Sequence, residues 1–207
     1  MKYLLFLLYS ISSIANSENF VKITHSDGLY GSGVKVFYKG TSYIATNGHI
    51  CLKNDYSLGK NSLPGNLKVK TEKTSFLIKN PKIKVDFNND MCLIEANFKE
   101  GFKISLIDPR IGETVYYKTL NNPKEELSVK KGIILGIKNS SSVENFEGKK
   151  HFQSKNYIIS TNTVDGDSGS GVFNDKNELI GLVFASARVN KNNWGSFSSF
   201  KSSIFSK

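Results

Sequence analysis

The stretch Gly166-Asp167-Ser168-Gly169-Ser170-Gly171 decides how the rest of this chain is interpreted. It lies between two apolar runs typical of β-strands, Asn156–Ser160 and Gly171–Phe173, so its glycines fall on a tight connection. Glycine lets such a turn present the Ser168 hydroxyl outward while backbone N–H groups converge on one point. The stretch predicts a nucleophilic serine beside a site for an oxyanion. The alternative is that the stretch forms an ordinary loop with no catalytic role.

A histidine at the end of a predicted β-hairpin is the first candidate partner for Ser168. Residues Gly31–Tyr38 alternate between apolar and polar, and after a turn the pattern continues over Ser42–Thr46. His49 follows soon after, so we expect its imidazole to leave the end of a buried strand and face a cleft. His25, by contrast, is predicted to lie in a polar loop, where a histidine is usually structural or solvated.

An aspartate precedes another short apolar strand. Asp90 leads directly into Met91–Glu95, so its carboxylate can be partly buried and can orient an imidazole through the second ring nitrogen. Asp86 is the alternative, and either residue could simply belong to a turn. We favour Asp90 because it abuts the strand. With His49 as base, Asp90 would complete the set of groups that makes the Ser168 hydroxyl an effective nucleophile.

Most predicted elements are short β-strands, which indicates an all-β fold. The 207 residues allow one domain or two small fused halves, and long helical periodicity is missing from the sequence. The tail is the exception, because Phe197, Phe200, Ile204 and Phe205 have a helical spacing that predicts one short helix over about 197–206.

The N-terminus has the composition of a secretory signal peptide. Residues 1–17 combine a positive charge at Lys2, an apolar centre at Tyr3–Tyr9 and small residues up to Ser17, after which we expect cleavage. The alternative is a membrane anchor, but the apolar stretch is short and rich in serine. We therefore expect a secreted or periplasmic protein without stable membrane insertion.

The chain is basic. Its formal net charge is +10, which falls to +9 when Lys2 is removed with the signal peptide. The lysines are scattered over predicted strands and loops, and no recognition helix or zinc finger is found. We therefore expect a solvated basic face and no nucleic-acid partner.

Cys51 and Cys92 are the two cysteines of the sequence. They could form a disulfide in an exported protein or remain two buried thiols. Both follow apolar positions typical of core packing, so we favour the thiols slightly. Neither their spacing nor the histidine content indicates a metal site.

Three motifs together resemble those of the trypsin/chymotrypsin-like serine peptidases. They are Ala45–His49, Asp90–Ile94 and Gly166–Gly171, in that family's order and at a plausible spacing. The stretch Ser168–Gly181 looks like the bacterial glutamyl endopeptidase and exfoliative toxin branch, and Gly31–Val34 is similar to the start of the periplasmic heat-shock protease. The resemblance implies two six-stranded antiparallel β-barrels with a catalytic cleft between them.

The resemblance also implies a division of the chain. A single peptidase domain would span residues 18–207, with the first barrel over about 20–105 and the second over about 112–196. The domain would act as a monomer on proteins or peptides and would need no metal or organic cofactor, because the chain supplies every reacting group.

Roles for individual residues follow from the same resemblance. His49 would be the general base, Asp90 its orienting acid and Ser168 the nucleophile of an endopeptidase that forms an acyl-enzyme. The N–H groups of Gly166 and Ser168 would form the oxyanion hole. The substrate would contact Asn162, Thr163, Phe184, Ala185 and Ser186.

The predicted specificity pocket differs from those of well-known branches. Asn162 would lie at its base, where an aspartate would select lysine or arginine. Thr163 matches the threonine of glutamate-specific relatives, but Val183 stands where their histidine would be. Ala185 and Ser186 replace residues that are often glycine, so we expect a small or medium, uncharged residue on the acyl side of the cleaved bond.

Asp167 is a second departure, since the glutamyl branch more often has asparagine there. A buried aspartate needs a partner, which in trypsin-like zymogens is a newly cut N-terminus. The expected signal cleavage leaves a polar start instead of the usual apolar one. Of the two arginines, Arg110 and Arg188, we expect Arg110 to pair with Asp167.

Two other function classes remain as alternatives. A catalytically inactive homologue could act as a secreted binding protein, although the intact His, Asp and Ser argue against it. A basic nucleic-acid binder is supported by charge alone, and salt-dependent DNA binding would be its signature.

Overall fold

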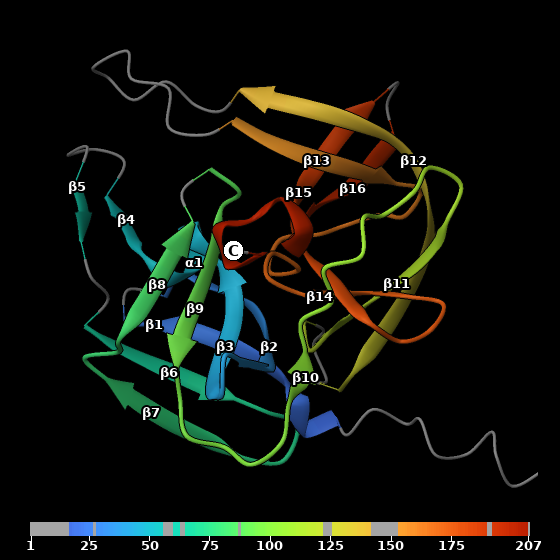
Figure 1. Ribbon diagram of the computed structural model, residues 1–207. Helices are drawn as coiled ribbons and strands as arrows, with labels where there is room; N and C mark the ends of the chain where they lie inside the picture. The colour runs from blue at the N-terminus through green and yellow to red at the C-terminus, as the bar shows by residue number, and fades with distance from the viewer. Residues whose placement is uncertain are drawn as a thin grey trace, which may run out of the picture.

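Most of the described strands belong to two largely antiparallel β-sheets that lie side by side (Figure 1). The computed structural model describes residues 17–26, 28–55, 60–62, 65–86, 88–121, 126–141, 153–189 and 192–206. The predicted signal peptide, apart from Ser17, therefore lies outside the described residues. Within these ranges, no helix combines the length and the apolar character needed to cross a membrane.

The N-terminal half forms an open, curled sheet. Its strands run in the order β7-β6-β1-β2-β3-β9-β8, with β10 added parallel to β2, and among the described residues the edge strands β7 and β8 do not pair with each other. This half is therefore a half-barrel of eight strands within the described residues, where the resemblance implied a closed barrel of six. The strands are β1 (Phe20–His25), β2 (Tyr30–Tyr38), β3 (Thr41–Asn47), β6 (Asn66–Lys70), β7 (Ser75–Lys79), β8 (Ile83–Asp86), β9 (Met91–Glu95) and β10 (Phe102–Lys103).

The C-terminal half is a closed barrel of six strands, as predicted. The pairing runs β11-β12-β13-β16-β15-β14 and returns to β11. Irregularities in register at Ile134/Gly136, Val172/Phe173 and Val183/Ala185 bend the strands, which helps a small barrel to close. The strands are β11 (Thr114–Thr119), β12 (Ser128–Ser141), β13 (Gln153–Ile159), β14 (Gly171–Asn174), β15 (Leu179–Val189) and β16 (Asn192–Ser199).

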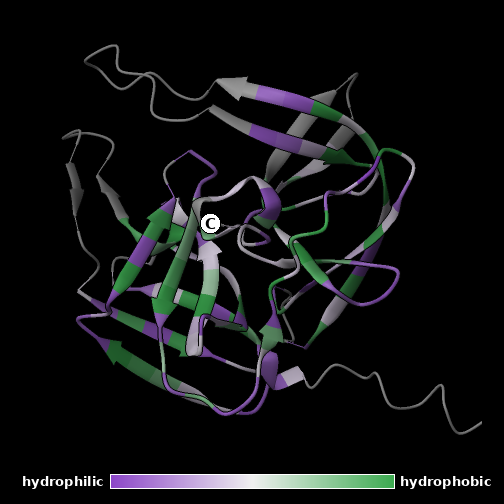
Figure 2. Cartoon of the chain, in the orientation of Figure 1, coloured by the Kyte–Doolittle hydropathy of each residue, from purple (hydrophilic) through white to green (hydrophobic). Residues whose placement is uncertain are grey.

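The sequence pattern explains why these segments are strands. Along β6, Leu67 and Val69 are buried while Asn66 and Lys68 are exposed, which is the period of two expected for a half-buried strand. Figure 2 shows the same banding of apolar and polar residues on the neighbouring strands. Before the C-terminal tail, the short described elements outside the two sheets are η1 (Ser17–Asn19), α1 (Gly48–Cys51) and the hairpin β4 (Lys53–Asp55) with β5 (Lys60–Ser62).

A shared apolar cluster joins the two halves. Phe20 of β1 lies edge-on to Phe173 of β14, with ring centroids 5.9 Å apart, and Phe102 lies 4.8 Å from Phe173. Phe200 and Phe205 from the C-terminal tail are buried in the same cluster. Each half also has a core of its own, and the shared cluster packs the two halves against each other.

The predicted C-terminal helix is wrong in its extent and type. Phe197 belongs to β16, where it pairs with Tyr157 and Val183, and its ring stacks on Tyr157 at 5.1 Å. Only after Ser199 does the chain turn, in the 3₁₀ segments η2 (Phe200–Ser202) and η3 (Ile204–Ser206). Barrel closure through β16 overrides the local helical spacing.

Candidate active site

The end of β3 and the turn before β9 are tied together by backbone contacts. Gly48 N–H donates to the carbonyl of Asp90 at 3.0 Å, and Asn47 Nδ2 donates to the same carbonyl at 3.1 Å. A Cβ at Gly48 would lie 2.9 Å from Asp90 Oδ1, so glycine permits this close approach. His49 follows in α1 and is thereby held over the carboxylate.

His49 contacts Asp90 at two points. The imidazole Nδ1 lies 2.5 Å from Oδ2, and the backbone N–H of His49 donates to Oδ1 at 2.8 Å. Asp90 is buried, with 2% of its side chain exposed, whereas 26% of the His49 side chain is exposed. This geometry holds Nδ1 as a donor to the carboxylate, and within the described part of the chain Nε2 has no hydrogen bond and can accept a proton.

Asp86, the alternative acid, occupies a different place. Its carboxylate accepts the Asn88 N–H at 3.1 Å and Asn89 Nδ2 at 2.8 Å, so it stabilises the turn between β8 and β9. The structure thus brings Asp90, and not Asp86, to His49.

Cys51 and Cys92 form a disulfide, so the slight preference for free thiols was wrong. Thr46 of β3 pairs with Cys92 of β9, and α1 turns back at the end of β3, which brings the two Cα atoms within 6.1 Å. Sequence alone could not show this register. The disulfide covalently links the segment that carries His49 to the strand that follows Asp90.

The serine turn has the backbone that its glycines allow. Gly166 and Gly169 have φ angles of +89° and +86°. Gly169 N–H donates to the carbonyl of Val183 at 2.9 Å, and the carbonyl of Ser168 accepts the Ser32 N–H at 2.8 Å. A Cβ at Gly169 would lie 2.0 Å from the Ser32 carbonyl oxygen, so the turn fits against β2 only with glycine at this position.

The Ser168 hydroxyl lies beside the same residue as His49. Ser168 Oγ donates to the carbonyl of Phe184 at 3.3 Å, and the Phe184 ring is edge-on to the imidazole at 6.4 Å. In this structure the Ser168 hydroxyl is hydrogen-bonded to the Phe184 carbonyl and not to the His49 imidazole.

Contacts to neighbouring carbonyls fix the direction of the Gly166 N–H. The carbonyl of Asp165 accepts a hydrogen bond from Asn121 Nδ2, and the carbonyl of Gly166 accepts one from Ser32 Oγ at 2.8 Å. Because a trans peptide directs its N–H opposite to its carbonyl, the first contact sets where the Gly166 N–H points. Within the described part of the chain this N–H donates no hydrogen bond.

The Ser168 N–H is fixed in the same way. The carbonyl of Asp167, in the same peptide, accepts the Ser170 N–H at 3.0 Å, and the Ser168 N–H has no acceptor among the residues that the structure describes. Two donors of one turn are thus held in place and left unused, as an oxyanion hole requires.

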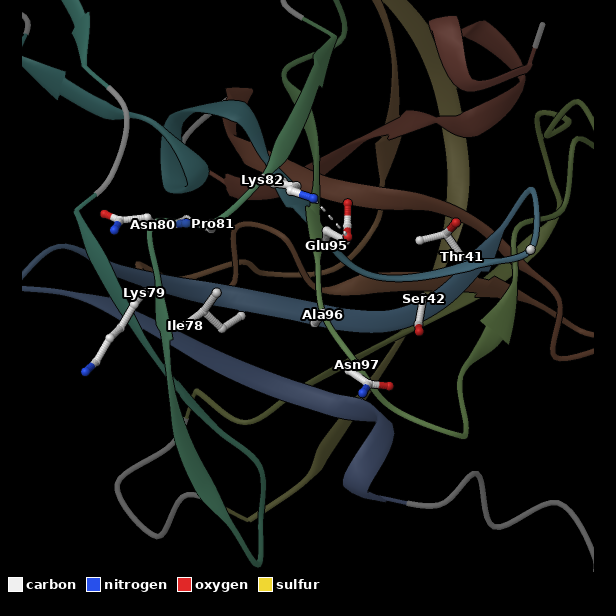
Figure 3. A pocket seen from close by; sticks show the side chains of 11 residues that line it. Thr41, Ser42, Ile78, Lys79, Asn80, Pro81, Lys82, Glu95, Ala96 and Asn97 are labelled. Carbon is white, nitrogen blue, oxygen red and sulfur yellow. Dashed lines mark ion pairs between the residues drawn. The ribbon is translucent and has the colours of Figure 1, made fainter.

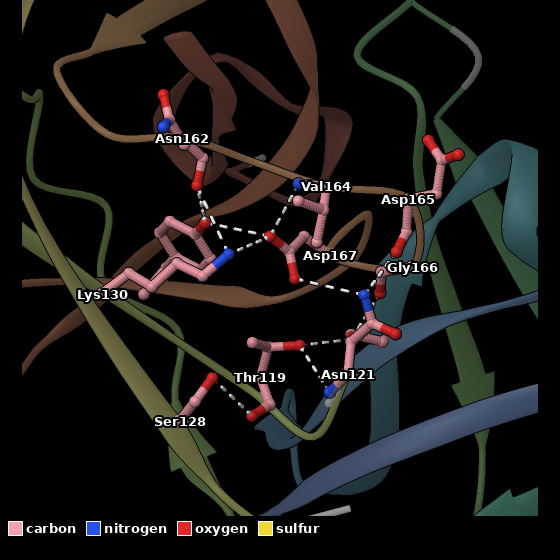
Figure 4. A network of polar contacts seen from close by, with 11 residues as sticks. Thr119, Asn121, Ser128, Lys130, Asn162, Val164, Asp165, Gly166 and Asp167 are labelled. Carbon is pink, nitrogen blue, oxygen red and sulfur yellow. Dashed lines mark hydrogen bonds and ion pairs between the residues drawn. The ribbon is translucent and has the colours of Figure 1, made fainter. Parts of the chain in front are cut away.

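Lys130 is the partner of Asp167, so the expected pairing with Arg110 was wrong. Lys130 Nζ lies 2.7 Å from Asp167 Oδ2, and Tyr117 OH donates to the same oxygen at 3.0 Å (Figure 4). Arg110 is exposed, and its backbone N–H donates to Glu113. Sequence proximity could not reveal Lys130, which reaches the turn from β12 across the barrel.

The residues predicted to contact substrate lie around the start of the serine turn and along β15. Asn162 is exposed, whereas Thr163 is buried and its Oγ1 has no hydrogen-bond partner among the residues that the structure describes. Ala185 and Ser186 continue β15 after Phe184, paired with Ser196 and Gly195 of β16, and their side chains lie outside the described part of the structure.

Several contacts behind the site were not foreseen. Ser32 bonds the serine turn through both its N–H and its hydroxyl, and Thr46 Oγ1 donates to the Ser32 carbonyl at 2.7 Å. His25 is buried at the end of β1 and its Nε2 is hydrogen-bonded to the Ile50 carbonyl, so its assignment to a polar loop was wrong. His25 is the last residue of β1, and the strand places its side chain in the interior.

An open groove lies away from these residues, on the first sheet (Figure 3). Its volume is about 550 Å³, and Lys82 and Glu95, two of the lining residues, form an ion pair with Nζ 4.0 Å from Oε1. None of the predicted site residues lines it. The lining residues are Gly40, Thr41, Ser42, Ile78, Lys79, Asn80, Pro81, Lys82, Glu95, Ala96 and Asn97.

Several solved structures of proteases have a similar fold. The active form of the Rv3671c protease from M. tuberculosis superposes with a TM-score of 0.68 at 17% identity, covering 90% of this chain and 78% of that one. The HtrA-type protease AlgW with tripeptide gives 0.64 at 16%, covering 89% of this chain and 57% of its own. Catalytically inactive tobacco etch virus protease complexed with substrate gives 0.57 at 21%, covering 88% and 78%.

At these identities the structures show a shared fold and no more. No curated protein matches the sequence. A family model described as "Trypsin-like peptidase domain" matches residues 31–182, which include His49, Asp90 and Ser168. Since this match covers most of the chain, the protein belongs to the trypsin-like peptidase domain family.

Proposed function

We propose that this protein is a secreted or periplasmic serine endopeptidase in which Ser168 is the nucleophile, His49 the general base and Asp90 its orienting acid. The observation that carries the proposal is the double contact between Asp90 and His49, set beside a serine turn with two unused N–H donors. A fold maintained only for binding has no need of that combination.

In the proposed mechanism, the Ser168 hydroxyl leaves the Phe184 carbonyl and turns toward His49. Its oxygen attacks the carbonyl carbon of the peptide bond while His49 Nε2 takes the proton. The N–H groups of Gly166 and Ser168 bind the oxyanion that forms. His49 then gives the proton to the departing amine, and a water molecule, activated by the same base, hydrolyses the acyl-enzyme.

The proposed substrate is an extended peptide that pairs with β15 near Phe184, Ala185 and Ser186. We propose that Thr163, whose Oγ1 is buried and has no hydrogen-bond partner among the described residues, forms part of the wall of the pocket for the residue before the cleaved bond. We propose a small or medium, uncharged residue there. The resemblance of the serine region to the glutamyl endopeptidase and exfoliative toxin branch remains part of this proposal.

Labelling with a fluorophosphonate tests the proposal, because the reagent modifies only an activated serine. We expect covalent labelling of the mature wild-type chain, complete loss in Ser168→Ala and unchanged labelling in Ser170→Ala, the matched control two residues away. If a folded wild-type chain is not labelled, the proposal fails. The result would then favour the hypothesis that the protein is a catalytically inactive homologue that acts by binding.

A further inference from the structure

The carboxylate of Asp167 is the centre of a buried polar network beneath the serine turn (Figure 4). Only 1% of its side chain is exposed, and Oδ2 accepts hydrogen bonds from Lys130 Nζ at 2.7 Å, Tyr117 OH at 3.0 Å and Val164 N–H at 3.0 Å. Asn121 Nδ2 approaches Oδ1 at 3.4 Å. The carboxylate therefore has a cation and several neutral donors within this chain.

The same network reaches both sides of the oxyanion donors. Val164, bonded to the carboxylate, also accepts the Asp167 N–H at 3.0 Å, and Asn121 contacts both the carboxylate and the Asp165 carbonyl. Asp167 itself stands between Gly166 and Ser168. Moving its carboxylate would therefore move the two peptides whose N–H groups are proposed to bind the oxyanion.

Lys130 is well placed to hold that carboxylate. Its Nζ also donates to the Asn162 carbonyl at 3.3 Å, which accepts the Tyr117 hydroxyl at 2.8 Å as well. Burial and the Asp167 charge raise the pKa of Tyr117, so this hydroxyl remains a donor. Both groups come from the barrel wall, Tyr117 from β11 and Lys130 from β12.

The first described residues of the chain are occupied elsewhere. Glu18 accepts hydrogen bonds from Thr71 Oγ1 at 2.8 Å and from the Lys73 N–H at 3.0 Å, both at the β6–β7 turn of the first sheet. Phe20, two residues later, is buried in the shared apolar cluster. The residues that follow the predicted signal cleavage site are thus bound to the first sheet. Asp167 is paired with Lys130, which belongs to the second sheet.

We propose that Lys130 is a built-in counter-ion of Asp167, a positioning residue that keeps the serine turn in its active form without a free amino terminus. This inference rests on the proposed peptidase function. A trypsin-like chain that uses its new N-terminus for this purpose is switched on by cleavage. Here no such cleavage is needed to order the turn.

Charge removal in two steps tests the proposal. Lys130→Met leaves Asp167 buried and unpaired, so we expect the rate of acylation by a peptide substrate to fall about 100-fold, the effect of losing an oxyanion donor, with KM little changed. Lys130→Arg and the double variant Lys130→Met/Asp167→Asn are expected to stay within about tenfold of the wild type, because each leaves no unpaired charge. Lys131→Met, the exposed neighbour on β12, is the matched control.

The N-terminus is tested in parallel. A chain that begins at Glu18 and the same chain carrying four additional Gly-Ser residues are expected to have equal rates. Activity in Lys130→Met equal to that of the wild type would overturn the inference, and so would a double variant that is no better than Lys130→Met. A chain that becomes active only when the extension is removed would overturn it as well.

Hydrogen exchange keeps this test separate from the test of peptidase function. We expect the N–H groups of Val164 and Asp167, measured by NMR, to exchange faster in Lys130→Met and to recover in Lys130→Met/Asp167→Asn. This readout applies even if the wild type cleaves nothing, in which case only the proposed function fails. Unchanged exchange in Lys130→Met contradicts the inference itself.

Discussion

Asp90 holds His49 through both of its carboxylate oxygens, one bonded to the imidazole Nδ1 at 2.5 Å and the other to the backbone N–H at 2.8 Å. One buried group therefore fixes the position of the histidine backbone and the orientation of its ring. A positive φ of 49° at Asp90 and the absence of a side chain at Gly48 make this approach possible.

Replacing this acid by its amide tests the contact. Asp90→Asn keeps the size of the side chain but can donate to Nδ1, which favours the wrong tautomer, so we expect the rate of fluorophosphonate labelling to fall about 10⁴-fold. Asp86→Asn, the control, should lower the free energy of unfolding by about 1 kcal/mol and leave the labelling rate unchanged. Equal rates in the two variants contradict the assigned role of Asp90.

Two glycines with the same φ of +86° allow the fit of the serine turn to be tested. At Gly169 a Cβ would lie 2.0 Å from the Ser32 carbonyl oxygen, whereas at Gly112 a Cβ would have no atom within 4 Å among the described residues beyond its two chain neighbours. We expect Gly112→Ala to cost about 1 kcal/mol of unfolding free energy, the penalty of a left-handed backbone. Gly169→Ala should cost about 4 kcal/mol or more and abolish labelling, since backbone must also move.

Urea unfolding of the two alanine variants is the measurement. Similar losses of unfolding free energy at both positions would show that the serine turn does not pack against β2 as described.

The disulfide is predicted to stabilise the site. Cys51 and Cys92 are separated by 41 residues in sequence and are fully buried. Loop closure in the unfolded chain gives a stabilisation of about 4 kcal/mol for such a separation. We expect Cys51→Ser/Cys92→Ser to melt at a lower temperature, and thiol titration after treatment with a reductant to detect free thiols only when denaturant is present. Thiols that form rapidly in the folded protein argue against burial.

Tyr117 gives the chain a defined response to alkaline pH. Burial and the Asp167 charge raise the pKa of Tyr117 above its ordinary value of 10.0. The folded state thus keeps the phenol proton that the unfolded state loses, so this contribution to stability is present below pH 10 and decreases as pH rises further, by at most about 1.4 kcal/mol per pH unit.

The variant Tyr117→Phe isolates this effect. It should be less stable at pH 8 because it loses the hydroxyl proton that is shared between the Asn162 carbonyl and the Asp167 carboxylate, yet its unfolding free energy should fall less steeply than that of the wild type from pH 10 to pH 12. Tyr116→Phe, on the adjacent position of β11, is the control. If the unfolding free energies of the wild type and Tyr117→Phe fall in parallel over this pH range, the raised pKa of Tyr117 is refuted.

The parts of the fold that depend on local pattern could be predicted from the sequence. The alternation over Gly31–Tyr38 predicted β2, and the glycines around Ser168 predicted a tight turn. The order of the motifs predicted that Asp90 would contact His49. This prediction depends on local sequence, because Asp90 directly precedes its strand.

Features that depend on which strands meet could not be predicted. The pairing of β3 with β9 brings Cys51 to Cys92, and the barrel brings Lys130 to Asp167 across 37 residues of sequence. The helix predicted for the C-terminal tail was wrong for the same reason. Phe197 takes part in strand pairing, which the helical spacing of the apolar residues does not reveal. Such long-range registers are set by the whole core.

The most direct test of the central claim is cleavage of a diverse peptide library by the mature chain, with the wild type beside Ser168→Ala and cut sites identified by mass spectrometry. The account predicts that the wild type cuts, with a preference for small or medium uncharged residues before the bond, and that Ser168→Ala cuts nothing. Equal cleavage by both chains, or none by a correctly folded wild type, would contradict it.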